Sequence, residues 1–167
     1  MENASKALIM AAGVLIGIMI LSLAVYLFAT FGSTSAELHK QKETDQLNQF
    51  NSQFTSYEGK EDITIYDVIT VSNLATENNK YYELERLDSL PTTNEVANNY
   101  IGVLLDNERL DYGKSTANEI INKKYNSKIN DELKEINGTQ KYLKTYTCKV
   151  DISSITGRVY KVTFTKK

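Results

Sequence analysis

Three carboxylates gather in one short segment of the sequence, LLDNERLDYG. They are Asp106, Glu108 and Asp111. Closely spaced carboxylate oxygens are the ligands that a hard cation such as Ca²⁺ prefers. Their spacing does not follow the EF-hand loop, and Arg109 lies inside the cluster. We therefore interpret the segment as an ordinary acidic turn, and the sequence predicts neither a metal site nor a cofactor.

The residues that nucleophilic catalysis requires are scarce and far apart. The one histidine, His39, stands beside Lys40 in a polar stretch, whereas the one cysteine, Cys148, falls on the apolar side of a predicted strand. A Cys–His or Ser–His–Asp arrangement needs these side chains within hydrogen-bond reach. The chain also contains no P-loop and no G-x-G-x-x-G or H-E-x-x-H motif. We predict that the protein is not an enzyme and that Cys148 is a small buried hydrophobe.

The charge balance argues against another class of function. The chain has 19 Lys plus Arg and 21 Asp plus Glu, and its formal net charge is −2. Nucleic-acid-binding domains carry a clustered excess of positive charge. A nucleic-acid partner is therefore not expected.

Tyrosine is the side chain best suited to recognition in this sequence. The chain has 11 Tyr, and a tyrosine can pack its ring while its hydroxyl forms a hydrogen bond, which suits contact with a protein or a glycan. The candidates for a binding surface are Tyr81, Tyr82, Tyr142 and Tyr146. The alternative is that these rings pack in or beside the core.

The most distinct element of the sequence is an apolar segment, Ala7–Phe31, which contains no charged residue. As a helix it would be about 37 Å long, enough to cross a hydrocarbon core of about 30 Å with some tilt. We predict a retained transmembrane helix, with Gly32 as its break. The alternatives are a signal peptide cleaved after Ala36 and a buried core helix, and the segment is longer than a signal peptide requires.

Two glycines inside this segment, Gly13 and Gly17, form a G-x-x-x-G motif. Glycines one turn apart allow a second membrane helix to approach closely. They are the candidates for helix packing and self-association, although glycine is common in membrane helices anyway.

The two flanks of the segment give a preference for its orientation. Lys6 touches the apolar segment directly, whereas Lys40 and Lys42 are separated from it by an uncharged stretch. Positive charge close to the membrane favours the cytoplasmic side. We expect the protein to be a single-pass protein of the cell membrane with an extracellular C-terminal domain, and a cytoplasmic domain is the alternative.

The remaining chain predicts an α+β protein. Leu47, Phe50, Phe54 and Tyr57 form an aromatic stripe at helical spacing, so the transmembrane helix is expected to continue as an amphipathic stalk helix. The predicted parts are a stub at residues 1–6, the transmembrane helix at 7–31, a linker and stalk helix at 32–57, and a globular domain at 58–167.

Within the globular domain we predict helices and an antiparallel sheet that ends in a β-hairpin. Thr64 with Asp67 and Thr116 with Glu119 resemble capping boxes at the starts of two helices. The second helix would place Ile120, Ile121, Tyr125, Ile129, Leu133 and Ile136 on its apolar side. The run YIGVLL predicts a strand, and alternating residues on either side of a turn at 153–157 predict the hairpin.

This layout resembles two groups of proteins. An apolar N-terminal helix, an amphipathic helix and a small domain ending in a hairpin are similar to type IV pilins and pseudopilins. The stretches FNSQFTSYEG and IYDVITVSNLATENN resemble small membrane-anchored proteins of unassigned function from Gram-positive gut bacteria. No Gly-Phe processing site precedes the helix, and no Glu lies inside it.

Two functions follow as expectations from the layout and the resemblance. The first is a non-enzymatic, pilin-like structural or assembly subunit, anchored in the bilayer and able to self-associate through its helix. The alternative is a membrane-tethered extracytoplasmic binding module that recognises a protein or glycan.

Overall fold

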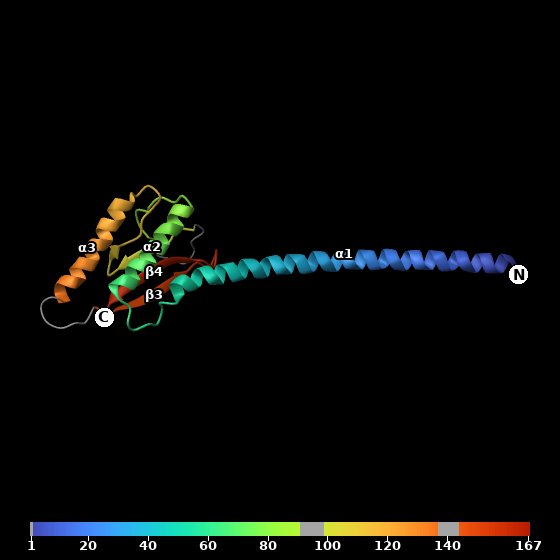
Figure 1. Cartoon of the computed structure of the whole chain (residues 1–167), viewed down its shortest axis with the longest axis horizontal. Coiled ribbons are helices and arrows are strands. Elements are labelled where there is room, and N and C mark those ends of the chain that lie inside the picture. The colour runs from blue at the N-terminus through green and yellow to red at the C-terminus, as the bar shows by residue number, and fades with distance from the viewer. Residues whose placement is uncertain (1, 91–98, 137–143) are drawn as a thin grey trace. The chain divides into compact units, whose positions relative to one another are not determined.

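The computed structural model describes residues 2–90, 99–136 and 144–167. It shows an α+β chain (Figure 1). The elements are α1 (Glu2–Thr55), α2 (Ile65–Tyr81), β1 (Gly102–Leu105), β2 (Glu108–Arg109), α3 (Asn118–Ile136), β3 (Tyr146–Ile152) and β4 (Val159–Lys166). The chain divides into two compact units, Met1–Gln46 and Leu47–Lys167.

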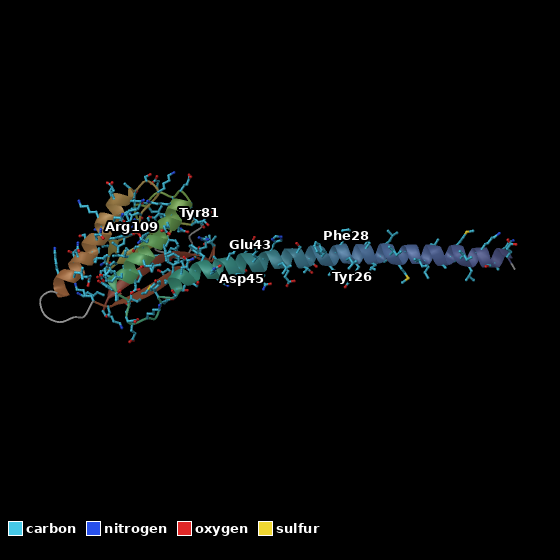
Figure 2. The ribbon with its side chains drawn as sticks, in the orientation of Figure 1. Tyr26, Phe28, Glu43, Asp45, Tyr81 and Arg109 are labelled. Atoms are coloured by element: carbon cyan, nitrogen blue, oxygen red, sulfur yellow. The ribbon has the colours of Figure 1, made fainter. Side chains whose placement is uncertain are left out.

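The first unit belongs to α1, a single helix of 54 residues. The predicted break at Gly32 is wrong, because α1 continues through it. A glycine costs a helix only about 1 kcal/mol relative to alanine, and the backbone hydrogen bonds on both sides outweigh that cost. Side chains along this unit, including Tyr26, Phe28, Glu43 and Asp45, project from a bare helix (Figure 2).

By its length and composition, α1 is a candidate membrane span. None of its apolar window is buried inside the chain, whereas a core helix of a soluble protein would be mostly buried. The described residues contain one such helix. An apolar surface of this kind is stable in a solvent that is itself apolar, and a bilayer is such a solvent.

The last turns of α1 belong to the second unit. Phe54 is only 1% exposed, and Phe50 and Tyr57 pack against the same core. The predicted aromatic stripe therefore faces the core, as its spacing indicates. The helix ends at Thr55, and the chain turns at Gly59, whose φ of 78° favours glycine.

The sheet has four strands in the order β2-β1-β4-β3. The predicted hairpin is confirmed, because β3 and β4 pair antiparallel. The predicted antiparallel sheet is wrong in one respect, since β1 pairs parallel with β4, so the sheet is mixed. The alternation of polar and apolar residues in β3 and β4 indicates which face of each strand is buried, but it does not identify the strand that pairs with the other edge of β4.

The hairpin buries one face and leaves the other in contact with water. Cys148 is opposite Phe164 and Val150 is opposite Val162, and all four side chains are buried. Ile152 departs from the prediction with 42% exposure, because the register shifts between Asp151 and Ile152.

The two predicted helices of the domain are present, with one corrected start. In α2 the capping box is formed: the backbone N–H of Thr64 donates to the carboxylate of Asp67 over 2.8 Å. In α3 the helix begins at Asn118 and the Ala117 carbonyl accepts the first helical bonds, so the start predicted at Thr116 is one residue too early. Ile120 is 60% exposed and not part of the buried stripe, which Ile121, Tyr125 and Ile129 form at intervals of four residues.

The outer edge of the sheet is partly blocked. The backbone N–H of Tyr146 in β3 donates to the Ile63 carbonyl over 2.9 Å, and the N–H of Val150 donates to the Glu58 carboxylate over 3.2 Å. Unpaired edge strands invite pairing with other chains. The segment that follows α1 therefore protects β3 from this kind of association.

Candidate functional site

The candidate site is a groove in the second unit, lined by aromatic, amide and charged side chains, which we call the Arg158 groove. It has a volume of about 410 Å³. Side chains from the end of α1, the second half of α2 and the turn between β3 and β4 line it. They are Phe50, Gln53, Leu74, Glu77, Asn78, Tyr81, Tyr82 and Arg158.

An asparagine on α1 holds the turn that carries Arg158. The Asn51 Nδ2 donates to the Gly157 carbonyl over 2.7 Å, and the Val159 N–H donates to the Asn51 Oδ1 over 3.0 Å. The side-chain amide of Asn51 thus donates to the backbone of the turn and also accepts from it, as the backbone of a paired strand would. Gly157 has a φ of 67°, and a Cβ there would meet the Leu47 side chain at 3.0 Å. A glycine therefore permits both the turn and the close approach of α1.

The guanidinium of Arg158 is held between aromatic rings. Its Cζ lies 3.9 Å from the ring centroid of Phe50 and 5.3 Å from that of Tyr82, and its Nη2 donates to the Asn78 Oδ1 over 3.1 Å. Cation–π contacts of this kind fix the position of a planar guanidinium. Among the described residues, no carboxylate forms an ion pair with it, and its buried Nε has no hydrogen-bond partner.

Two buried asparagines fix the α2 wall of the groove. Asn79 exchanges hydrogen bonds with the backbone of Ile101: its Nδ2 donates to the carbonyl over 2.9 Å and its Oδ1 accepts the N–H over 2.8 Å. Asn78 donates to the Asn99 carbonyl over 2.6 Å. These bonds tie the last turn of α2 to the chain that leads into β1, so the tyrosines that follow have a rigid base.

The predicted tyrosine surface is present only in part. Tyr81 is 80% exposed and Tyr82 is 37% exposed. Their rings pack edge to face, with the ring centroids 5.0 Å apart. Figure 2 shows Tyr81 at the end of α2. Tyr146 is wrong as a surface candidate, because it is buried and its hydroxyl donates to Glu132 over 2.6 Å. Tyr142 lies outside the described residues.

The two glycines predicted for helix packing lie on the exposed part of α1. A Cβ built at Gly13 or at Gly17 would meet nothing within 4 Å. Neither glycine is therefore required by a contact inside the chain that the structure describes. Their role in contacts between chains stays a prediction.

The acidic segment is divided between two structural tasks. Asp111 is fully buried and accepts bonds from the Tyr100 hydroxyl and the Arg109 guanidinium, each over 2.5 Å. Glu108 forms ion pairs with Lys124 and Lys128 of α3. Burial acts to raise the pKa of Glu108, but the hydrogen bonds and charges of the two lysines outweigh it and lower the pKa. Within the described ranges, no three His, Cys, Asp or Glu side chains form a metal-binding group.

The cysteine and the histidine belong to different compact units. Cys148 is buried in β3, and burial, followed by the charge of Glu58, raises the pKa of its thiol to about 12. His39 is exposed on α1 in the other compact unit. A thiol that stays protonated at neutral pH is a poor nucleophile, which agrees with the interpretation of Cys148 as a core residue.

Sequence reasoning missed Arg158, the charged residue that the turn between β3 and β4 contributes to the groove. Arg158 reads as an ordinary turn residue after Gly157, and Asn51 reads as one more polar residue of the stalk. Only a contact across about a hundred residues of chain brings them together. The sequence signal that points to the site is the adjacent pair Tyr81 and Tyr82.

Comparison with known proteins adds no family to this picture. No protein-family model, no curated protein and no solved structure matches the chain. The likeness to pilins and to small membrane-anchored proteins therefore remains a resemblance of layout.

Proposed function

We propose that the protein is a non-enzymatic, single-pass membrane-anchored surface protein that acts as a pilin-like structural or assembly subunit. One observation carries the proposal: α1 runs without a break from the apolar segment into the folded unit. The same helix thus offers an apolar surface at one end and contributes Phe54 to the core at the other. A subunit that assembles through its helix needs such a continuous link to the domain that it displays.

The assembly surface in this proposal is the face of α1 that carries Gly13 and Gly17. Because these positions have open space around them, a second helix can approach the backbone there. Contacts between identical chains in the bilayer would then replace the contacts that this segment lacks within one chain.

Crosslinking in intact membranes tests the assembly. We expect the wild-type chain to give a series of oligomers and the double variant Gly13→Leu with Gly17→Leu to give monomers, because two leucines hold the helices apart. The double variant Val14→Leu with Ile18→Leu, on the next face of the helix, is the control and should keep the oligomers. A wild-type chain that is monomeric, or oligomers that survive the glycine changes, would refute the proposal.

The proposal places residues 33–167 outside the cytoplasm. It is supported by Lys6, which adjoins the apolar segment, whereas Lys40 and Lys42 lie further from it and are accompanied by acidic residues. Protease treatment of intact cells should remove the domain. If the domain is cut only after the membrane is permeabilised, it lies in the cytoplasm and the surface role is wrong.

The Arg158 groove favours a second candidate function, a membrane-tethered binding module. Its exposed Tyr81 and its ring-bound Arg158 resemble the aromatic and arginine anchors that dominate recognition sites. This function requires no self-association. It therefore predicts normal activity for the glycine variants that abolish assembly.

A further inference from the structure

We propose that the Arg158 groove binds an acidic oligosaccharide, a sugar chain that carries carboxylate groups. This inference rests on the second candidate function and names the class of ligand for it. It depends on two features of the groove: a fixed positive charge that no carboxylate of the described residues pairs with, and a lining that combines aromatic rings with planar polar groups.

The guanidinium of Arg158 gives the groove its positive charge, and no described carboxylate forms an ion pair with it. By contrast, Arg109 elsewhere in the domain is neutralised by Asp111 over 2.5 Å. A guanidinium matches a carboxylate with paired N–H donors. The rings of Phe50 and Tyr82 hold Arg158 in place beforehand, so little side-chain entropy is lost when a carboxylate binds.

The lining of the groove favours a sugar over a helical peptide. Leu74 is the one aliphatic side chain of the groove, while Tyr81 offers an exposed ring and Gln53 an exposed amide. A sugar ring has an apolar C–H face, which packs on an aromatic ring, and a rim of hydroxyls, which bind amides and carboxylates. A helical peptide would instead need a groove of aliphatic pockets for its apolar anchors.

A second charge limits how acidic the ligand can be. Glu77 lines the groove and is exposed. Its carboxylate accepts hydrogen bonds from sugar hydroxyls, but it repels a ligand with dense negative charge. The groove therefore suits a chain with separated carboxylates, such as one uronic acid among neutral sugars, better than a polyphosphate.

The test measures binding to the full-length chain in detergent micelles by isothermal titration calorimetry. The probes are tetrasaccharides that contain uronic acids, from polygalacturonate, alginate and hyaluronan, together with neutral tetrasaccharides of galactose and glucose. A peptide of alternating Glu and Tyr is a further probe. We expect at least one acidic tetrasaccharide to bind with a dissociation constant below about 1 mM, and at least ~10-fold more tightly than the neutral sugars.

Two substitutions should locate the site. Arg158→Gln should weaken the acidic tetrasaccharide about 10-fold and remove its advantage over the neutral sugars. Arg158→Lys, which keeps the charge, should retain part of that advantage. Tyr81→Ala should weaken acidic and neutral sugars alike, and because Tyr81 is exposed the variant should fold normally.

Matched controls exist for both positions. Tyr66 is an exposed tyrosine of α2 outside the groove, and Arg86 is an arginine that stacks on another ring, that of Tyr112. The variants Tyr66→Ala and Arg86→Gln should bind as the wild type does. Near-UV circular dichroism should show that every variant keeps its tertiary structure.

The possible results separate the inference from the function on which it rests. If the Glu–Tyr peptide binds through Arg158 and no sugar does, the groove is a binding site and the sugar assignment is wrong. If no probe binds more tightly than about 1 mM, both the inference and the binding module are refuted. Equal losses in the groove variants and their controls would also refute the site.

Discussion

The two compact units of the chain are stabilised in opposite ways. In Met1–Gln46 every described side chain is exposed or only partly covered, and a single helix holds the unit together. In Leu47–Lys167 a core of apolar side chains from all the helices and three of the four strands is buried. The first unit depends on its surroundings, a bilayer or another chain, and the second depends on its own contacts. Substitutions in the two units should therefore differ in effect even when the residue type is the same.

The largest difference should come from two phenylalanines of the same helix. Phe54→Ala removes a core ring and should lower the free energy of unfolding of the domain by about 3–5 kcal/mol, because Phe54 is 1% exposed. Phe28→Ala changes an exposed ring of the apolar segment and should leave domain unfolding unchanged. Urea unfolding of the full chain in detergent, followed by near-UV circular dichroism, measures both. Equal effects would contradict the division into two units.

Within the second unit, two asparagines one turn apart on α1 distinguish a position that contacts the rest of the domain from one that does not. Asn51→Ala removes both bonds to the β3–β4 turn and leaves the buried N–H of Val159 unpaired, which should cost about 1–3 kcal/mol. Asn48 is exposed, and Asn48→Ala should have no measurable effect. The same unfolding experiment applies. If Asn51→Ala is also neutral, the turn does not depend on α1.

The smallest expected effect is a dependence on pH. The pKa of Glu108 is lowered in the folded protein, so its stabilising contribution is complete above its unfolded value of 4.5 and is lost as the pH falls through the folded value. Its side chain is 38% exposed, and we expect less than about 1 kcal/mol.

The measurement compares the unfolding of wild type and Glu108→Gln from pH 7 to pH 3. The difference in stability should be present at neutral pH and should shrink as the solution becomes acidic. Glu119→Gln, at an exposed position of α3, the helix that carries Lys124 and Lys128, is the control. A difference that grows toward low pH would show that the lysines do not lower the pKa.

Of the residues that line the groove, only the two tyrosines were predicted from the sequence as binding residues. Tyr81 and Tyr82 follow a predicted helix next to two asparagines, and their types alone suggest recognition. The same argument failed for Tyr146, because a tyrosine in an alternating strand reads the same whether its hydroxyl meets water or a buried carboxylate such as Glu132. Residue type indicates what a side chain can do, and its surroundings decide what it does.

Features that depend on local spacing could be predicted from the residues alone. These are the apolar segment, the aromatic stripe at the end of α1, the Thr64 and Asp67 capping box of α2 and the two faces of the C-terminal hairpin. Each follows from the periodicity of a helix or a strand, which neighbouring residues express without help from the rest of the chain.

Contacts between distant segments became known only from the packed chain. In it β1 runs parallel to β4, Asn51 binds the turn before β4, and the Arg158 guanidinium contacts the rings of Phe50 and Tyr82. Such contacts depend on shape and on the pairing of buried polar groups, which are properties of the packed chain. Residues that form such contacts show no regular spacing in the sequence, so the place of Arg158 in the groove could not be predicted from it.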